Sequence, residues 1–570
     1  MKTKNTILAL IVNLFCVTSS LQAQQPKLEW AKQMSGSSSE NGTAMAMDSS
    51  GNIYTIGLFY QTVDFNPSAI TYTLTSNGET DIFITKLDAQ GNLLWAKQIG
   101  GASYDYPGNI AVDAFGNLLV GGSFRGTVDL NPGVGELNVT MPGRAAFLLK
   151  LNSDGDFMWA KHWGGNSSST ANNIYAIALD SSGNIILGGS FEGKNDLNPG
   201  TETFNVSPSG AGDAYILKLD ANGEFLWAVA FGGNVFNQID KVSALAVDGS
   251  GNIVASGPFY GSVEVFNLKD GGNFYIKLDG SGNLIWAKQT DGSESVITNS
   301  LKLDETGNAY IVGRFGGTRD FDPGPEVFNV TCSSGYYDIF ILKLTASGNF
   351  VWAKGFGGSA SLGGDSGNSI VLDNQGYLYT TGSYVGSGDF NPGVGELILT
   401  PVGFVDMFIS KFDTAGNFVY AKTFGSTPNG FTNGQSLIAD ASGNVFCTGY
   451  FQNTTDFNPG SGEFNLVSKG GEDIFILKLS QTTVGITQNT FTENIQVYPN
   501  PTTGNFAIKF ETMQKDLSVR ILSISGQIIK TMTFQNTDFV QLKLNQLAGM
   551  YLVEMINEEG NKSIIQIIKK

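Results

Sequence analysis

A short acidic loop that recurs along the chain is the sequence feature closest to a metal site. It reads Asp, then Phe or Leu, then Asn or Asp, then Pro, and it starts at Asp64, Asp129, Asp196, Asp320, Asp389 and Asp456. Carboxylate and amide oxygens suit Ca²⁺, which takes about six to eight of them. Each loop offers only two such side chains, whereas an Asx turn needs one Asp to cap the backbone and gains from the fixed φ of Pro. We therefore predict turns and no cofactor, with Ca²⁺ binding as the alternative.

Residues 364–367 (Gly-Asp-Ser-Gly) resemble the nucleophile loop of chymotrypsin-like proteases. A serine nucleophile needs a histidine base within hydrogen-bond reach. The only histidine in the chain is His162, which lies in a different repeat, far from Ser366 in the sequence. We interpret the tetrapeptide as a glycine-rich turn before a strand.

Paired carboxylates are a further route to chemistry, because a glycosidase needs two of them at a fixed separation in a cleft. The chain has 51 acidic residues, so chance pairs are common. The most regular Asp residues, however, stand at equivalent positions of a repeated phrase, which indicates a structural role. We predict no catalytic residue, and we keep a hydrolase or lyase with a carboxylate or calcium site in a central channel as the alternative function.

Two sequence motifs repeat along the chain with the same spacing. The strands and turns that they predict must position any such side chains. The first is an apolar strand that ends in Trp-Ala-Lys or a close variant, with its aromatic residue at Trp30, Trp95, Trp159, Trp227, Trp286, Trp352 and Tyr420. The second is Asp, two residues, then Gly-Asn or a variant, with its acid at Asp48, Asp113, Asp180, Asp248, Asp304, Asp373 and Asp440. Self-similarity at a fixed period indicates an array of equivalent units. The tryptophans could stack on sugars, but on outer strands we expect them to fill the space between units.

Each repeat predicts four short antiparallel strands, which in the first complete repeat lie near residues 43–48, 53–60, 81–88 and 93–99. Seven such sheets around an axis make a seven-bladed β-propeller. The first strand of each blade should line the axis, since it carries small residues such as Ala44 and Ser300; Lys302 is the exception. The last repeat lacks its Trp strand, so we expect residues 28–32 to pair with residues 473–479 and close the ring.

These phrases resemble the SBBP-type bacterial propeller repeats, over about residues 28–479. The resemblance implies a seven-bladed propeller and carries no general activity with it. We accordingly predict a propeller domain at residues 24–480, followed by a polar linker at 481–492.

A different module occupies residues 493–570, where short alternating strands predict a small Ig-like β-sandwich. Its ordered motifs resemble the type A sorting domain of the Bacteroidetes type IX secretion system. The residues that carry the likeness are Tyr498, Pro499, Asn500, Pro501, Gly504, Gly526, Gly549 and Tyr551. The resemblance implies two partners, the type IX secretion machinery and a sortase-like peptidase that usually removes the module.

Residues 1–23 have the order of a secretory signal peptide, with a basic start, an apolar run and cleavage expected after Ala23. No later apolar run approaches the length of a transmembrane segment. The formal net charge of −18 argues against nucleic acid and anionic lipid as partners. Cys332 and Cys447 lie in different repeats, so a disulfide scaffold is excluded and buried thiols are expected. The sequence thus predicts a monomeric, secreted or surface-displayed, non-enzymatic propeller that binds a glycan or protein.

Overall fold

The computed structural model describes residues 24–290, 295–333, 335–359, 364–483, 495–523, 528–546, 549–558 and 562–570. The chain divides into one compact unit at Gln24–Gln481 and another that contains Thr482–Lys570. In the described residues the regular structure is β-strand, apart from one turn of 3₁₀-helix at Glu264–Phe266. No described helix is long and apolar enough to cross a membrane. The expected signal peptide at 1–23 lies outside the described residues, as does most of the expected linker.

The larger unit contains repeated sets of four antiparallel strands, called sheets 1 to 7 here in chain order of their first strands. Sheets 2 and 3 are joined by a parallel bridge between Arg144 and Ala171, and sheet 7 is extended by two short strands at residues 62–64 and 73–75. Sheets 1 to 3 consist of β2 (Glu40–Met47), β3 (Ile53–Phe59), β6 (Asp81–Leu87) and β7 (Leu93–Ile99); β8 (Tyr106–Val112), β9 (Leu118–Asp129), β10 (Asn138–Leu151) and β11 (Phe157–Gly164); and β12 (Ala171–Leu179), β13 (Ile185–Glu192), β16 (Gly212–Leu219) and β17 (Phe225–Phe231). Sheets 4 and 5 consist of β18 (Ala244–Val247), β19 (Ile253–Phe259), β20 (Gly272–Leu278) and β21 (Leu284–Thr290); and β22 (Val296–Leu303), β23 (Ala309–Phe315), β26 (Asp338–Leu344) and β27 (Phe350–Phe356). Sheets 6 and 7 consist of β28 (Ser366–Leu372), β29 (Tyr377–Tyr384), β32 (Asp406–Asp413) and β33 (Phe418–Phe424); and β34 (Thr432–Ala439), β35 (Val445–Phe451), β38 (Asp473–Thr483) and β1 (Gln24–Gly36).

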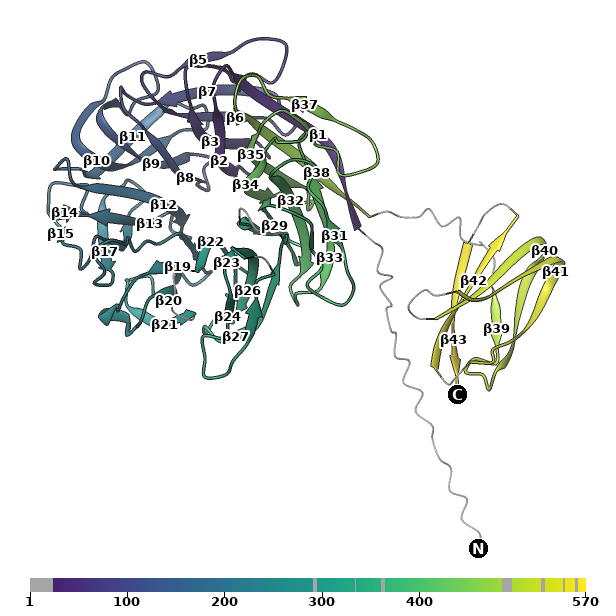
Figure 1. Ribbon diagram of the computed structural model, residues 1–570. Helices are drawn as coiled ribbons and strands as arrows, with labels where there is room; N and C mark the ends of the chain where they lie inside the picture. The colour runs from purple at the N-terminus through teal and green to yellow at the C-terminus, as the bar shows by residue number, and fades with distance from the viewer. Residues whose placement is uncertain are drawn as a thin grey trace, which may run out of the picture. The chain divides into compact units, whose positions relative to one another are not determined.

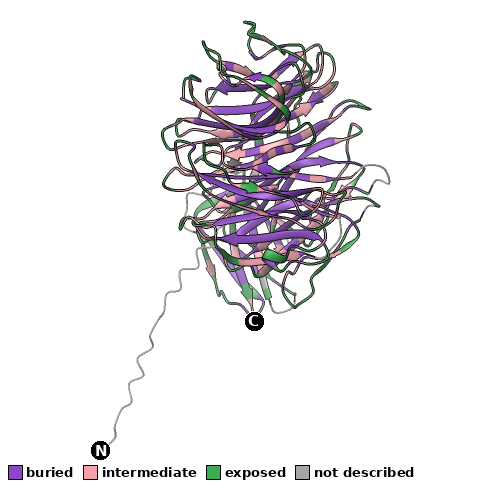
Figure 2. Ribbon diagram, turned by 90° about the vertical axis from the view of Figure 1, so that its left-hand side faces the viewer, coloured by how far each residue is buried: buried purple, intermediate pink, exposed green. Residues whose placement is uncertain are grey.

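The first strand of each sheet faces a common centre (Figure 1). One cavity is lined by residues of all seven first strands, together with Ser243 just before β18. The first strands therefore lie on the inner side of the sheets. Small side chains such as Ala44, Ala176 and Ala244 occur there because the sheets converge and leave little room. The second and third strands are the most buried, as in β3 and β6, whose residues are almost all buried. Figure 2 shows buried strands in purple running through the interior.

The N-terminal strand β1 completes sheet 7 by lying beside β38, so the two ends of the larger unit meet in one sheet. Ser480 Oγ donates to Glu29 Oε1 over 2.6 Å, and the backbone N–H of Gly471 donates to Ser38 O over 2.7 Å. The strand pairing expected for residues 28–32 is therefore present, in a longer strand than the sequence suggested.

The loop between the second and third strands is more ordered than the sequence indicated. It contains a two-stranded hairpin in five sheets: β4 (Thr62–Asp64) with β5 (Thr73–Thr75), β14 (Asn195–Asp196) with β15 (Asn205–Val206), β24 (Thr318–Asp320) with β25 (Asn329–Thr331), β30 (Gly388–Asp389) with β31 (Ile398–Leu399), and β36 (Thr454–Asp456) with β37 (Asn465–Val467). In sheet 2 the hairpin continues β9 and β10, and sheet 4 has the 3₁₀ turn instead. The acidic Asp-Pro loop is the tip of each hairpin.

The second unit contains β39 (Gln496–Tyr498), β40 (Asn505–Ser523), β41 (Ile528–Lys543), β42 (Gly549–Asn557) and β43 (Lys562–Lys569). The strands pair in the order β39-β40-β42-β43, and β41 also pairs with β40, so the long β40 joins all five in one hydrogen-bonded set. Its core includes Phe506, Ile508, Val519 and Val553, which are buried against one another.

Candidate functional site

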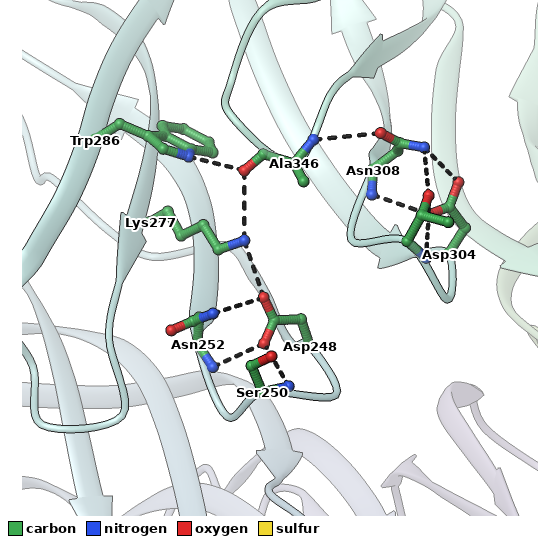
Figure 3. A network of polar contacts seen from close by, with 9 residues as sticks. Asp248, Ser250, Asn252, Lys277, Trp286, Asp304, Asn308 and Ala346 are labelled. Atoms are coloured by element: carbon green, nitrogen blue, oxygen red, sulfur yellow. Dashed lines mark hydrogen bonds and ion pairs between the residues drawn. The ribbon is translucent and has the colours of Figure 1, made fainter.

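The Asp of the repeated turn is held by its own backbone and by a neighbouring lysine, and this accounts for its recurrence. Figure 3 shows Asp248, whose carboxylate accepts hydrogen bonds from the backbone N–H groups of Ser250 and Asn252 and lies 2.9 Å from Lys277 Nζ. Lys277 Nζ and Trp286 Nε1 both donate to Ala346 O, which belongs to a turn of the next sheet. Each of these polar groups is satisfied within the scaffold, so the repeated Asp residues are structural.

The repeated Trp side chains fill space between sheets. The ring of Trp286 packs on Gly348 in the next sheet, where an added Cβ would lie 2.9 Å from the ring. Gly348 also has φ of 77°, which only glycine adopts readily. The same contact joins Trp95 to Gly155 and Trp352 to Gly416. These tryptophans are therefore packing residues, as the sequence predicted.

The acidic Asp-Pro loops have the geometry of Asx turns. Asp64 Oδ1 accepts hydrogen bonds from the N–H of Asn66 at 3.1 Å and of Tyr72 at 2.8 Å. The matching pairs recur at Asp129, Asp196, Asp320, Asp389 and Asp456. Among the described residues no group of three or more His, Cys, Asp or Glu side chains is placed to hold a metal ion. Capping of the backbone explains the loops without a cation.

The protease-like tetrapeptide is part of the scaffold. Ser366 Oγ donates to Asn368 Oδ1 over 2.7 Å on β28 of sheet 6, whereas His162 lies on β11, the outer strand of sheet 2. Asp365 is buried and accepts hydrogen bonds from the N–H groups of Gly358 and Val385. No serine nucleophile with a histidine base is formed by these residues.

The central channel is a cavity of about 350 Å³ lined by residues of the first strands. Lys302 is the single charged residue of the described lining, and no carboxylate belongs to it. Lys302 is accessible to water along the channel, yet protein groups surround it closely enough for desolvation to lower its pKa. The described lining therefore contains neither an acid–base pair nor a carboxylate ligand for calcium.

Most polar groups of the channel wall bond neighbouring sheets together. Ser300 Oγ accepts from the N–H of Ile370, and Ser369 Oγ accepts from the N–H of Leu437. Asn299 Nδ2 donates to Gly367 O over 3.0 Å. Ser300, Ser369 and Asn299 are thus occupied by contacts between sheets 5, 6 and 7.

A groove opens where the first strand of sheet 2 begins, and the sequence analysis did not find it. It has a volume of about 700 Å³, and its lining includes Tyr104, Tyr106, Arg125, Arg144 and Glu192. The rings of Tyr104 and Tyr106 are nearly parallel, with centroids 6.4 Å apart and an interplanar angle of 20°. The guanidinium carbon of Arg144 lies 4.4 Å from the centroid of the Tyr106 ring. A signal was available in the sequence, because neither tyrosine recurs at the matching positions of the other repeats.

Carboxyl groups are also buried in pairs between neighbouring sheets, another feature that the sequence analysis missed. Asp81 begins the third strand of sheet 1 and interacts electrostatically with Asp105, just before the first strand of sheet 2. Asp213 with Asp240, Asp338 with Asp365, and Asp473 with Glu40 repeat this arrangement. Burial raises the pKa of Asp105, Asp240 and Asp365 to about 7 in each case. These groups bind protons near neutral pH, but they lie inside the sheet interfaces and away from the channel.

The residues of the expected sorting motif are placed in the second unit. Asn500 Nδ2 donates to Gln566 O over 2.6 Å, and Asn500 Oδ1 accepts from the N–H of Ile568, so Asn500 ties the start of the module to β43. Tyr498–Pro499 and Asn500–Pro501 are cis peptides. Gly504 precedes β40, and Gly549 and Tyr551 lie on β42. Gly526 lies outside the described residues.

Two family models match the chain. A secretion system C-terminal sorting domain matches residues 496–570, and a β-propeller repeat of the SBBP type matches residues 94–123. The chain therefore carries both features that the sequence motifs indicated. The sorting domain indicates export through the type IX secretion system to the cell surface or the extracellular space, and it implies contact with the secretion machinery.

The chain matches only part of the length of each of two curated relatives. An uncharacterized WD repeat-containing protein, L264, of Acanthamoeba polyphaga mimivirus is 23% identical over 549 residues, which cover 79% of this chain and 38% of the relative. The regulatory protein FlaEY of Caulobacter vibrioides is 30% identical over 184 residues, or 31% of this chain and 18% of the relative. The chain thus spans well under half of either protein.

Solved structures show distant similarity. A protein of unknown function from Bacteroides caccae has 12% identity and a TM-score of 0.28, over 58% of this chain and 92% of that one. A protein of unknown function from Dyadobacter fermentans has 12% identity and a TM-score of 0.33, over 66% of this chain and 94% of that one.

Proposed function

We propose that this exported protein is a non-enzymatic binding protein, in which a closed seven-bladed β-propeller at residues 24–480 presents a glycan- or protein-binding surface. In this proposal residues 1–23 are a signal peptide, residues 481–492 are a linker and residues 493–570 are an Ig-like sorting sandwich that a sortase-like peptidase removes. In this proposal the sorting domain directs export of the protein, and the propeller binds the ligand at the cell surface or in the extracellular space.

Contacts between neighbouring sheets support a closed ring. In sheets 1 to 5 a lysine of the third strand donates to a carbonyl of the next sheet, as Lys277 does to Ala346 and Lys343 does to Thr414. Lys478 of sheet 7 makes the corresponding contact with Ala89 O of sheet 1 over 3.5 Å. The last sheet thus meets the first as the others meet their neighbours, which is the arrangement of a propeller.

The observation that carries the binding role is the uneven distribution of side chains on a regular scaffold. Repeated polar residues are satisfied by scaffold contacts, whereas Tyr106, Arg144 and Lys302 interrupt the repeat at the channel and its mouth. The alternative, a hydrolase or lyase with a channel carboxylate or calcium site, draws no support from a described lining without carboxylates. Aromatic and arginine side chains beside a groove are typical of recognition surfaces.

A glycan array and a pull-down from the native extracellular environment test this function directly. The exported protein should retain a defined glycan or protein on the array or the beads, and it should leave that ligand chemically unchanged in a mass-spectrometric assay. Cleavage of the ligand would replace the binding role with an enzymatic one. No retained ligand in either screen would overturn the proposal.

A further inference from the structure

Three cations lie over tyrosine rings at one mouth of the channel. Arg144 covers Tyr106 at 4.4 Å, Lys241 covers Tyr175 at 5.1 Å, and Arg314 covers Tyr337 at 4.8 Å, each measured to the ring centroid. We call these six residues the mouth arc. Tyr106 begins β8, Lys241 and Tyr337 lie just before β18 and β26, and Arg314 lies near the end of β23. These positions share one end of antiparallel sheets, while Arg144 and Tyr175 lie within β10 and β12.

The cations of the mouth arc have no acidic partner at ion-pair distance in the described part of the chain. Lys241 and Arg314 are close enough that burial and, secondarily, repulsion by Arg314 lower the pKa of Lys241. Keeping two like charges together costs free energy unless an anion compensates them. In a chain of net charge −18, the pair of positive charges at Lys241 and Arg314 is unexpected for a purely structural surface, whereas Arg144 lies within the electrostatic influence of Glu192 in the groove.

Two buried polar atoms near the mouth also lack a hydrogen-bond partner among the described residues. They are Arg314 Nε and Ser243 Oγ, and Ser243 also lines the channel. A buried donor without an acceptor costs about 1–3 kcal/mol. Because both atoms are buried, they mark an unsatisfied polar region beneath the mouth.

The arc is continuous with the groove beside sheet 2. Tyr106 and Arg144 line that groove, whereas Tyr175 lines the channel and lies within the electrostatic influence of Arg144. Tyr104 extends the aromatic surface outward and is 47% exposed. A ligand that contacts both Tyr104 and Tyr175 would therefore span the groove and the adjoining part of the channel.

The mouth arc departs from the repeat at Lys241 and at Arg314. The strand position of Lys241 is occupied in the other sheets by Asn41, Tyr106, Asn173, Ile297, Ser366 and Asn433. The position of Arg314 is occupied by Leu58, Ser123, Ser190, Pro258, Ser383 and Tyr450. Since the other sheets form without a cation there, packing alone does not demand one.

We infer that the mouth arc and its groove bind an acidic oligosaccharide, a chain of sugars that carry carboxylate or sulfate groups. Tyrosine faces pack against sugar rings, while Arg and Lys pair with the anionic substituents, Arg in a bidentate manner. Hydroxyl groups of Ser103, Ser169 and Thr170 in the groove can bond the sugar hydroxyls. This inference rests on the proposed binding function and specifies its ligand class.

The test uses the exported full-length protein and isothermal titration with four defined probes. These are a galacturonate hexamer for carboxylates, a heparin hexasaccharide for sulfates, cellohexaose as the neutral saccharide and hexaglutamate as the acidic peptide. One or both acidic saccharides should bind at least tenfold more tightly than cellohexaose and hexaglutamate, and affinity should fall as salt rises. Whichever acidic probe binds identifies the anionic group.

Variants locate the site. Lys241→Gln, Arg314→Gln and Tyr106→Ala should each weaken binding at least tenfold, and Lys241→Arg should keep it within about threefold because the charge remains. Lys288→Gln on β21 of the same sheet as Lys241 is the matched control, since it removes the same charge from the outer strand and should change nothing. Equal melting temperatures establish that each variant is folded, and Lys241→Arg keeps the test decisive if Lys241→Gln unfolds.

The inference would be overturned by equal affinity for cellohexaose, by tighter binding of hexaglutamate, or by unchanged binding in the arc variants. If none of the four probes binds, the inference fails as well. In each case the proposed binding function survives if the array or the pull-down returns another ligand, and it fails only if they return none.

Discussion

Gln33 of β1 donates a 2.5 Å hydrogen bond to Asp473 of β38, although the two residues are 440 positions apart in the sequence. Gln98 makes the equivalent bond to Asp81 inside sheet 1, where both strands come from one repeat. Sheet 7 therefore reproduces with strands from the two ends of the larger unit what sheet 1 builds from a single repeat. This equivalence supports the closure that we propose for the ring.

Deleting residues 24–33 should destabilise the larger unit strongly. The deletion removes most of β1, exposes the edge of β38 and leaves Asp473 without Gln33, so the free energy of unfolding should fall by several kcal/mol. Chemical denaturation of the full and shortened chains measures this. Truncation after Thr483 is the control, because it removes more residues but no strand of sheet 7. An unchanged midpoint after the N-terminal deletion would contradict the closure.

Stability should fall as the pH rises from about 5 to 8. The buried carboxyls Asp105, Asp240 and Asp365 have pKa values raised to about 7, so in this window the folded state holds protons that the unfolded state has released. Unfolding is then favoured by higher pH, and the free energy of unfolding declines across the window. Burial, with the added charge of Asp473, raises the pKa of Glu40 in the same direction.

Melting temperatures across this pH range measure the effect. Asp105→Asn and Asp365→Asn should flatten the decline, because the amide carries no proton to lose. Asp88→Asn is the control, since its turn hydrogen bonds, the largest from Asn92, hold the pKa of Asp88 below its usual value despite some burial. A decline that Asp105→Asn and Asp365→Asn both leave intact would show that other groups titrate.

Removing divalent cations should not change the melting temperature. The Asp of each Asp-Pro loop is occupied by backbone N–H donors, as in Asp64 with Asn66 and Tyr72, so no bound ion is required to hold the loop. Scanning calorimetry with and without a chelator measures this. A large decrease that Ca²⁺ reverses would make the loops metal sites. Asp64→Ala should cost about 1 kcal/mol whether or not the chelator is present.

Removing residues 493–570 should block the last step of export while leaving the larger unit folded. The described contacts of sheets 1 to 7 need nothing beyond Thr483, so the truncated chain should reach the periplasm and melt at the same temperature as the complete chain. Fractionation of source cells with an antibody against the larger unit measures the distribution. Asn500→Ala, which breaks the tie to β43, should reduce the extracellular amount in the same assay. Normal extracellular levels of the truncated chain would contradict the sorting role.

The sequence alone determined the repeat, the strands of each repeat and the C-terminal sorting domain. The Trp and Asp phrases repeat in step, and turn chemistry and alternating hydrophobicity act over a few residues, so the turn at Asp48 and the strand at Trp95 could be predicted locally. The missing strand of the last repeat also predicted the pairing that β1 makes with β38. The motif around Tyr498 indicated the sorting domain that the family model confirms.

Only the tertiary structure decided which side chains meet between sheets. Asp81 meets Asp105, Lys277 meets Ala346, and Lys241 comes near Arg314 because adjacent sheets pack at one register and twist, which no local pattern specifies. The sequence analysis therefore classed Lys302 as the main irregularity and missed the mouth arc, whose residues are separated by whole repeats. Contacts over such separations depend on how the sheets pack against one another, and that geometry appears only when all of them are in place.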